Sequence, residues 1–117
     1  KKGTMTDKKQ HTGYLVDVKS KLISLVKVTD FEDILKHLAC DIFTIAHTDK
    51  DTGDALYVDD IGRLKRKKPT DFFMFSDYPE PLAGNGLLLG TSPDGESKDC
   101  EIDLLDFAVK VSFLEKL

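Results

Sequence analysis

Hydrophobic and polar residues alternate near the start of the chain. Tyr14, Val16 and Val18 place an apolar side chain at every second position. This period of two puts the three side chains on one face of a strand. A polar break at 19–21 separates them from a second apolar run, rich in β-branched residues, that ends at Val28. The pattern predicts a β-hairpin.

The apolar spacing changes to a helical period after this hairpin. Thr29 or Asp30 offers a side-chain oxygen as N-cap, and Glu32 and Asp33 fall in the first turn, where negative charge suits the helix dipole. The pattern therefore predicts an amphipathic helix. Its apolar stripe follows the spacing i, i+3, i+4, i+7 and consists of Phe31, Ile34, Leu35 and Leu38.

Further strands are expected where apolar residues alternate or run continuously between turn residues. In the first of them, the alternation places Phe43, Ile45 and His47 on one side. Asp60 to Gly62 suits a tight turn, so 43–64 is predicted as a β meander. The other runs are DFFMFS at 71–76, which holds four consecutive apolar residues, and LLLG at 87–90, a short central strand.

The C-terminal segment fits two interpretations. Asp103 could cap a helix over about 103–110, in which Leu104, Leu105 and Ala108 share a face. The alternation of residues 109, 111 and 113 is instead typical of a strand. We predict the helix and leave the last residues open.

These elements predict an α+β fold. We expect a mostly antiparallel sheet of five to six short strands, with one helix packed on a face and a second short helix near the C-terminus. At 117 residues, the chain is the size of one domain, which we place at 13–117. Residues 1–12 are expected to form a disordered arm, and 1–4, which precede Met5, to be a remnant of an expression vector.

Composition narrows the possible functions. The chain has no apolar run near the roughly 20 residues that cross a bilayer, so we expect a cytoplasmic protein without membrane contact. Its formal charge of −4 argues against generic DNA binding. Two cysteines and three scattered histidines give no four-ligand zinc spacing, so we expect free thiols, no metal and no cofactor.

Two motifs resemble binding sites but miss the required spacing. Gly84, Gly86 and Gly90 depart by one residue from the dinucleotide-binding fingerprint, and no helix follows them to hold a phosphate. We therefore interpret Asn85 and Gly86 as a left-handed turn and Gly90 as the end of a strand.

An acidic cluster resembles a calcium loop in the same incomplete way. Asp49, Asp51 and Asp54 are hard oxygen ligands, but Gly53 is the fifth residue of the run where an EF-hand needs glycine at the sixth. The twelfth residue is Asp60 and not the bidentate Glu that the EF-hand requires. A solvated hairpin turn is the better interpretation.

A cationic run stands out in this acidic chain. The basic segment, residues 63–68, carries five cations that could dock a polyanion or an acidic protein face. Phe72, Phe73 and Tyr78 follow it and could stack bases, although the run 72–75 is more easily placed in the core. An exposed strand edge at 72–75 would also allow a homodimer. The cations are Arg63, Lys65, Arg66, Lys67 and Lys68.

Catalytic motifs do not stand out. The chain has no G-x-S-x-G elbow and no H-E-x-x-H pair, and His37 on the predicted helix is expected to be a packed or surface imidazole. We therefore expect a protein that is not an enzyme.

Two segments together carry a family resemblance. The runs ALYVDDIGRLK and PLAGNGLLLGTSPDGE, with a short terminal helix, resemble a family of small domains from phages, plasmids and their hosts. The resemblance spans about 13–114 and implies a compact α+β unit from mobile DNA, without an activity. The basic segment is not part of the family pattern. The matching positions are Val58, Asp59, Asp60, Gly62, Pro81, Gly84, Gly86 and 87–90.

The sequence thus predicts a non-enzymatic binding or accessory protein of a mobile element, with a host protein as partner. Two alternatives are a nucleic-acid-binding module that uses the same segment and a small-ligand sequestering protein with a pocket of Tyr57, Tyr78 and Asn85. The expected partner-binding residues are Arg63, Lys65, Arg66, Lys67, Lys68 and Tyr78.

Overall fold

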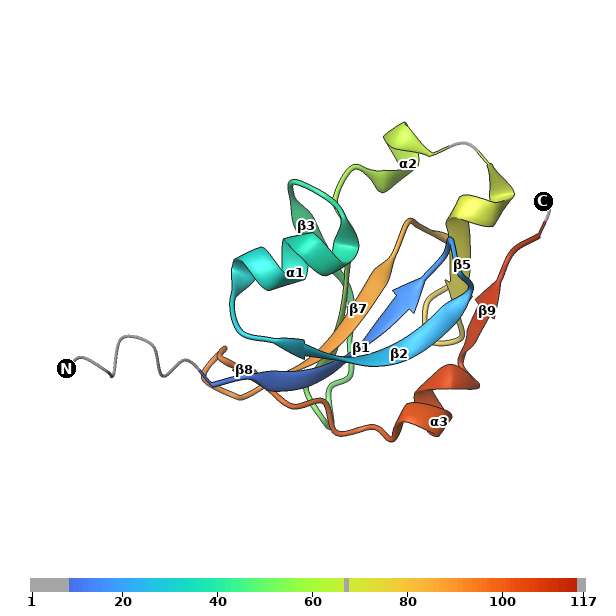
Figure 1. The fold of residues 1–117 in the computed structure, drawn as a ribbon. Helices are drawn as coiled ribbons and strands as arrows, with labels where there is room; N and C mark the ends of the chain where they lie inside the picture. The colour runs from blue at the N-terminus through green and yellow to red at the C-terminus, as the bar shows by residue number, and fades with distance from the viewer. Residues whose placement is uncertain (1–8, 67, 116–117) are drawn as a thin grey trace.

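An antiparallel sheet forms the centre of the molecule (Figure 1). The computed structural model describes residues 9–66 and 68–115. Within them, the sheet has six strands in the order β2-β1-β7-β4-β3, with β8 paired to β7. This arrangement confirms the predicted α+β class. The strands are β1 (His11–Asp17), β2 (Leu22–Val28), β3 (Phe43–Thr48), β4 (Asp54–Asp59), β7 (Gly86–Thr91) and β8 (Ser97–Lys98).

A second, three-stranded sheet packs against one face of the first. Its middle strand is β5 (Phe72–Phe75), which lies between β6 (Leu82–Ala83) and β9 (Val111–Phe113). The side chains of Phe73 and Phe75 are buried. β5 pairs with β9 at 73–75 and with β6 at 72 and 73, so it is not the exposed edge strand from which a possible homodimer was inferred.

Three helices accompany the sheets in the described residues. In α1 (Phe31–Leu38), the Asp30 side chain accepts a hydrogen bond from Asp33 N at 3.1 Å, and Ala39 ends the helix in a left-handed conformation. The predicted N-cap therefore forms, with Asp30 as the capping residue, but only Ile34 and Leu38 of the predicted stripe are buried, and Phe31 is 72 % exposed. α2 (Gly62–Lys65) is a single turn followed by a 3₁₀ turn at Pro69–Asp71, and α3 (Leu104–Ala108) lies beside β2 (Figure 1).

The central sheet separates two cores. On one face, Ile34 and Leu38 of α1 pack with Leu87 and Leu89 of β7. On the other face, Leu88 packs with the second sheet and α3 through residues such as Phe73 and Phe107. β7 is thus covered on both sides, which explains why its sequence is continuously apolar.

Several predicted boundaries were wrong. β1 begins at His11, within the expected disordered arm, and residues 1–8 lie outside the described part of the chain. The run after Asp60 forms α2 and does not continue a β meander. At the C-terminus both interpretations hold in part, because α3 ends at Ala108 and β9 follows it.

The glycines of 84–90 have roles that differ from the predicted ones. Gly84 has a positive φ of 83°, so the left-handed residue is Gly84 and not the predicted Asn85 or Gly86. At Gly86, an added Cβ would lie 2.6 Å from Cζ of Phe73. Gly90 lies inside β7 and does not end it.

Gly86 provides the first testable prediction. We expect Gly86→Ala to lower the free energy of unfolding by about 1–3 kcal/mol, because the methyl group has to displace the ring of Phe73. Urea denaturation measures the loss. In a Phe73→Leu background, which frees space at this position, the same change should cost less. Equal costs in the two backgrounds would contradict this role of Gly86.

Candidate functional site

The basic segment is partly folded into the protein. Arg63 and Lys65 lie on α2, Arg66 follows directly, and Lys68 is exposed. Lys67 lies outside the described residues. Of the predicted contact residues, Arg63 and Lys65 are thus held on the single helical turn α2 that follows β4 (Figure 1).

Two of these cations neutralise a buried carboxylate. The side chain of Asp59, at the end of β4, is fully buried, with its Oδ2 2.6 Å from Nζ of Lys65 and 3.0 Å from Nη1 of Arg66. Its Oδ1 accepts a hydrogen bond from Ile61 N. Burial raises the pKa of Asp59, but these hydrogen bonds and the charge of Lys65 lower it by a larger amount. The net pKa therefore lies below its usual value.

The third cation is also paired. Nη2 of Arg63 donates to Oε1 of Glu80 at 2.9 Å and to the carbonyl oxygen of Pro81 at 2.6 Å. Arg63, Lys65 and Arg66 thus have carboxylates of the same chain as partners. This pairing reduces the charge that the segment offers to a polyanion.

The same region forms a groove that the sequence analysis missed. This cavity of about 320 Å³, here the α2 groove, lies between α2, the end of β4 and the loop that carries Tyr78. Leu64 on α2 is 77 % exposed and Ile61 is 44 % exposed. The structure therefore brings two of the predicted contact residues, Arg63 and Tyr78, to one cavity, whose lining is largely apolar. The sequence feature that could have indicated this groove is the apolar Leu64 between Arg63 and Lys65.

The predicted small-ligand pocket does not form. Tyr57 packs in the core on the α1 side of the sheet, whereas Tyr78 packs against the core on the other side. The side chain of Asn85 links two segments by accepting from Val18 N and donating to the His37 carbonyl, both at 3.1 Å. These three residues serve different parts of the fold.

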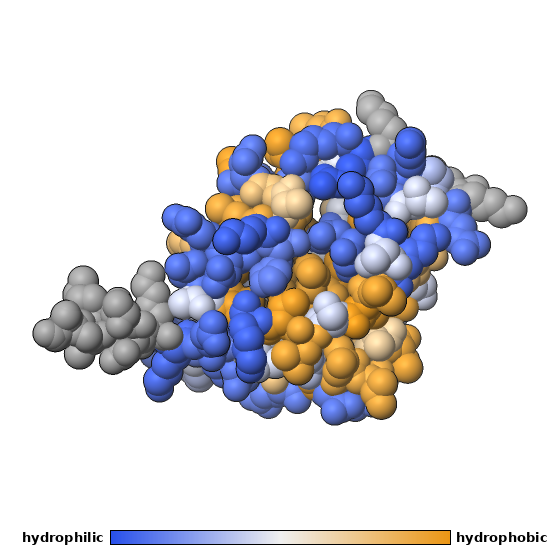
Figure 2. Space-filling view, viewed as in Figure 1, coloured by the Kyte–Doolittle hydropathy of each residue, from blue (hydrophilic) through white to orange (hydrophobic). Residues whose placement is uncertain are grey.

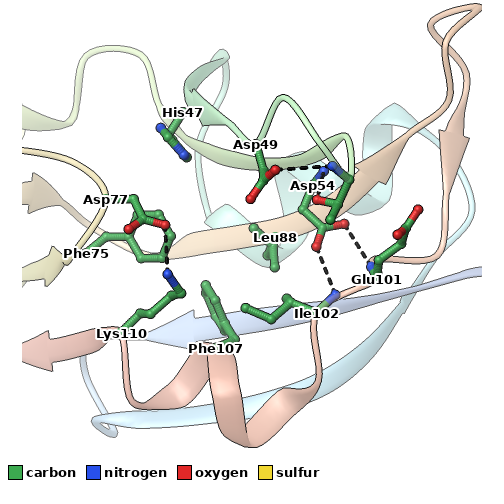
Figure 3. A pocket seen from close by; sticks show the side chains of 11 residues that line it. His47, Asp49, Asp54, Phe75, Asp77, Leu88, Glu101, Ile102, Phe107 and Lys110 are labelled. Atoms are coloured by element: carbon green, nitrogen blue, oxygen red, sulfur yellow. Dashed lines mark hydrogen bonds and ion pairs between the residues drawn. The ribbon is translucent and has the colours of Figure 1, made fainter.

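A different pocket opens between the two sheets (Figure 3). This inter-sheet pocket has a volume of about 230 Å³. Its apolar wall is formed by Phe75, Leu88, Ile102 and Phe107, and its polar side chains are His47, Asp49, Thr52, Asp54, Asp77, Glu101 and Lys110. None of the seven polar residues was a predicted site residue.

A β-bulge turns His47 into this pocket. The pairing of β3 with β4 shifts between Ile45 and His47, so that Ala46 is the extra residue. Ile45 lies opposite Tyr57 of the α1-side core, but His47 lies opposite Leu56 of the other core. The imidazole packs edge-on against Phe75 at 5.7 Å between ring centroids. Simple alternation placed His47 on the wrong face.

The aspartates of the calcium-like cluster point to different partners. Oδ1 of Asp49 accepts from the backbone N–H groups of Asp51 at 2.8 Å and Thr52 at 3.1 Å, and these bonds lower its pKa. Asp54 accepts from the backbone N–H groups of Glu101 at 2.8 Å and Ile102 at 3.0 Å. Among the described residues, no three His, Cys, Asp or Glu side chains converge to hold a metal ion.

The two cysteines are free thiols. Burial raises the pKa of Cys100 to about 11, and it also raises the pKa of Cys40. The Tyr14 hydroxyl donates to the Ile102 carbonyl at 2.7 Å, and burial raises its pKa to about 12. These groups are protonated at neutral pH, which makes them poor nucleophiles.

An apolar surface lies on the face seen in Figure 2. Hydrophobic side chains gather there over β2 and α3. Its exposed members are Leu25, Leu105 and Val109. This β2–α3 surface is the main alternative to the α2 groove as a place for a partner.

Comparisons with known proteins gave no relative. No protein-family model, curated protein or solved structure matches the chain. In the part of the chain that the structure describes, no helix has the length and apolar character needed to cross a membrane.

Asp59 provides the second prediction. Asp59→Asn removes the charge that Lys65 and Arg66 neutralise but keeps an oxygen for the N–H of Ile61. We expect the free energy of unfolding at neutral pH to fall by about 1.5–3 kcal/mol. Because the folded pKa is lowered, this stabilisation is complete above the unfolded pKa of about 3.9 and is lost as the pH falls through the folded value.

Urea denaturation of the native protein and of Asp59→Asn, at neutral pH and at pH ~3, measures the difference in their free energies of unfolding. The difference should be smaller in acid. Asp60→Asn, at an exposed neighbouring position, should change stability by less than about 0.5 kcal/mol. A stability difference between the native protein and Asp59→Asn that grows in acid would refute the assignment.

Proposed function

We propose that this chain is a non-enzymatic protein-binding module that contacts its partner through the α2 groove. The observation that carries the proposal is the exposure of Leu64, at 77 %, on a helical turn beside a cavity of about 320 Å³. Together with Ile61, which is 44 % exposed and lines the same groove, Leu64 forms an exposed apolar surface rimmed by polar residues, and such surfaces mark protein contacts.

The charge distribution favours a protein over a nucleic acid. Affinity for nucleic acid comes from cations that replace the counterions of phosphates. Lys65 and Arg66 already share the carboxylate of Asp59, and Arg63 is paired with Glu80. A protein with an apolar depression and a few acidic residues at its rim would match Leu64 and the partly exposed ends of Arg63 and Lys65.

The adjacent sheet edge extends the contact surface. β3 is the last strand of the central sheet, and Thr44 and Ile45 on it line the α2 groove. An open edge can accept an additional strand from a partner. The bulge at Ala46 limits such pairing to the first half of β3.

The biological setting is proposed from the family resemblance. A host-interacting accessory protein of a phage or plasmid, acting in the cytoplasm, needs a binding surface and no catalytic centre. The high pKa of Cys100, about 11, supports a non-catalytic role for this thiol.

Two matched variants provide the third prediction. Leu64→Asp places a charge in the α2 groove, and Leu105→Asp does the same on the β2–α3 surface, where Leu105 is 73 % exposed. Both side chains are exposed, so neither change should alter stability by more than about 0.5 kcal/mol. Tagged proteins are incubated with nuclease-treated bacterial host extract, and bound proteins are quantified by mass spectrometry.

We expect Leu64→Asp to reduce capture of the main partner at least about tenfold, the effect of losing one central apolar contact, and Leu105→Asp to leave it unchanged. Capture should change little between about 50 and 200 mM salt. Loss with Leu105→Asp alone would move the interface to the β2–α3 surface. Tight, strongly salt-dependent binding of labelled DNA or RNA would favour a nucleic-acid-binding module.

A further inference from the structure

The inter-sheet pocket is separate from the α2 groove. The two cavities share no lining residue. The pocket is built from the far end of the sheets, where the hairpin loop after β3 faces the segment that leads into α3 (Figure 3). A ligand in this pocket would therefore bind independently of the proposed protein partner.

The charge around this pocket is negative. Its lining holds four carboxylates against one lysine. Three of the carboxylates are compensated by near neighbours. Asp77 pairs with Lys110 at 3.0 Å, Glu101 pairs with Lys98 at 2.7 Å, and Asp54 accepts two backbone N–H groups. The positive charge of Lys110 is therefore engaged and does not define the pocket.

Asp49 is the carboxylate with an unused oxygen. Both of its backbone hydrogen bonds end on Oδ1, and Oδ2 accepts no hydrogen bond from the described residues. Figure 3 shows this second oxygen on the side of the hollow above Leu88. The low pKa of Asp49 keeps the group ionised at neutral pH. An N–H donor with a positive charge is the complement of such an oxygen.

The opposite wall is aromatic. Phe75 and Phe107 lie 5.8 Å apart between ring centroids, and both line the pocket with Ile102 and Leu88. Phe107 and Phe75 are 0 % and 4 % exposed and pack on Tyr14 and His47, so these rings form an apolar floor of the pocket and do not offer their faces to a cation. A volume of about 230 Å³ is below the roughly 300 Å³ of the smallest drug-binding pockets, so a suitable ligand has about one ring.

We propose that the inter-sheet pocket binds a small organic amine, with the ammonium group at Oδ2 of Asp49 and the apolar body against Ile102 and Phe75. Carboxylate and apolar wall together select a compact cation with an apolar part. A neutral ligand of the same shape lacks the ion pair, and an anion is repelled by Asp49.

Three probes of equal size test this selectivity. Benzylamine, benzyl alcohol and benzoate are titrated into the ¹⁵N-labelled full chain, and backbone amide shifts are followed by NMR. We expect saturable binding of benzylamine, with shifts at Leu88, Glu101 and Phe107, and at least about tenfold weaker binding of the other two. Equal binding of all three probes, preference for benzoate or shifts elsewhere would overturn the proposal.

A pair of matched variants tests the role of Asp49. Asp49→Asn keeps an Oδ1 that accepts from Asp51 N and Thr52 N, so the turn should remain folded. Asp94→Asn is the control, because Asp94 also accepts a backbone N–H in a turn but does not line the pocket. Benzylamine affinity should fall at least about tenfold in the first variant and stay within about twofold in the second. Unchanged affinity in Asp49→Asn would refute the site.

Discussion

Two carboxylates buried at opposite ends of β4 hold the connecting segments against the central sheet. Asp54 binds the backbone of Glu101 and Ile102 just before α3, and Asp59 binds Lys65 and Arg66 at the end of α2. A buried carboxylate is stable only where hydrogen bonds or opposite charges replace its water. Asp59 therefore fixes the position of α2, in which Gly62 is the one buried residue.

The two cavities are consequences of these anchors. The Asp59 anchor sets α2 beside the Tyr78 loop and thereby forms the α2 groove. The Asp54 anchor holds residue 102 at the mouth of the second sheet and forms one wall of the inter-sheet pocket. The carboxylates of Asp54 and Asp59 are both bound to groups of the protein itself. The groups left for ligands are those beside them, Leu64 in the groove and Asp49 in the pocket.

Local patterns could be predicted from the sequence, and distant pairings could not. The hairpin of β1 and β2 and the N-cap of α1 depend on neighbours within a few residues, and both were predicted. The second sheet joins β5 to β9, almost forty residues later, and β6 has only two residues, too few for a period. The bulge at Ala46 inverts the face of His47 without any change in composition.

The glycine loop and the basic segment show why charge along a sequence does not measure charge at a surface. Separately, each is typical of an anion site. In the folded chain they lie against each other, because a Cβ at Gly84 would be 2.9 Å from Cζ of Arg66, and the same guanidinium binds Asp59. The anion that the basic segment holds is thus the protein's own carboxylate. What this part of the surface exposes is the apolar side chain of Leu64, which a charge count omits.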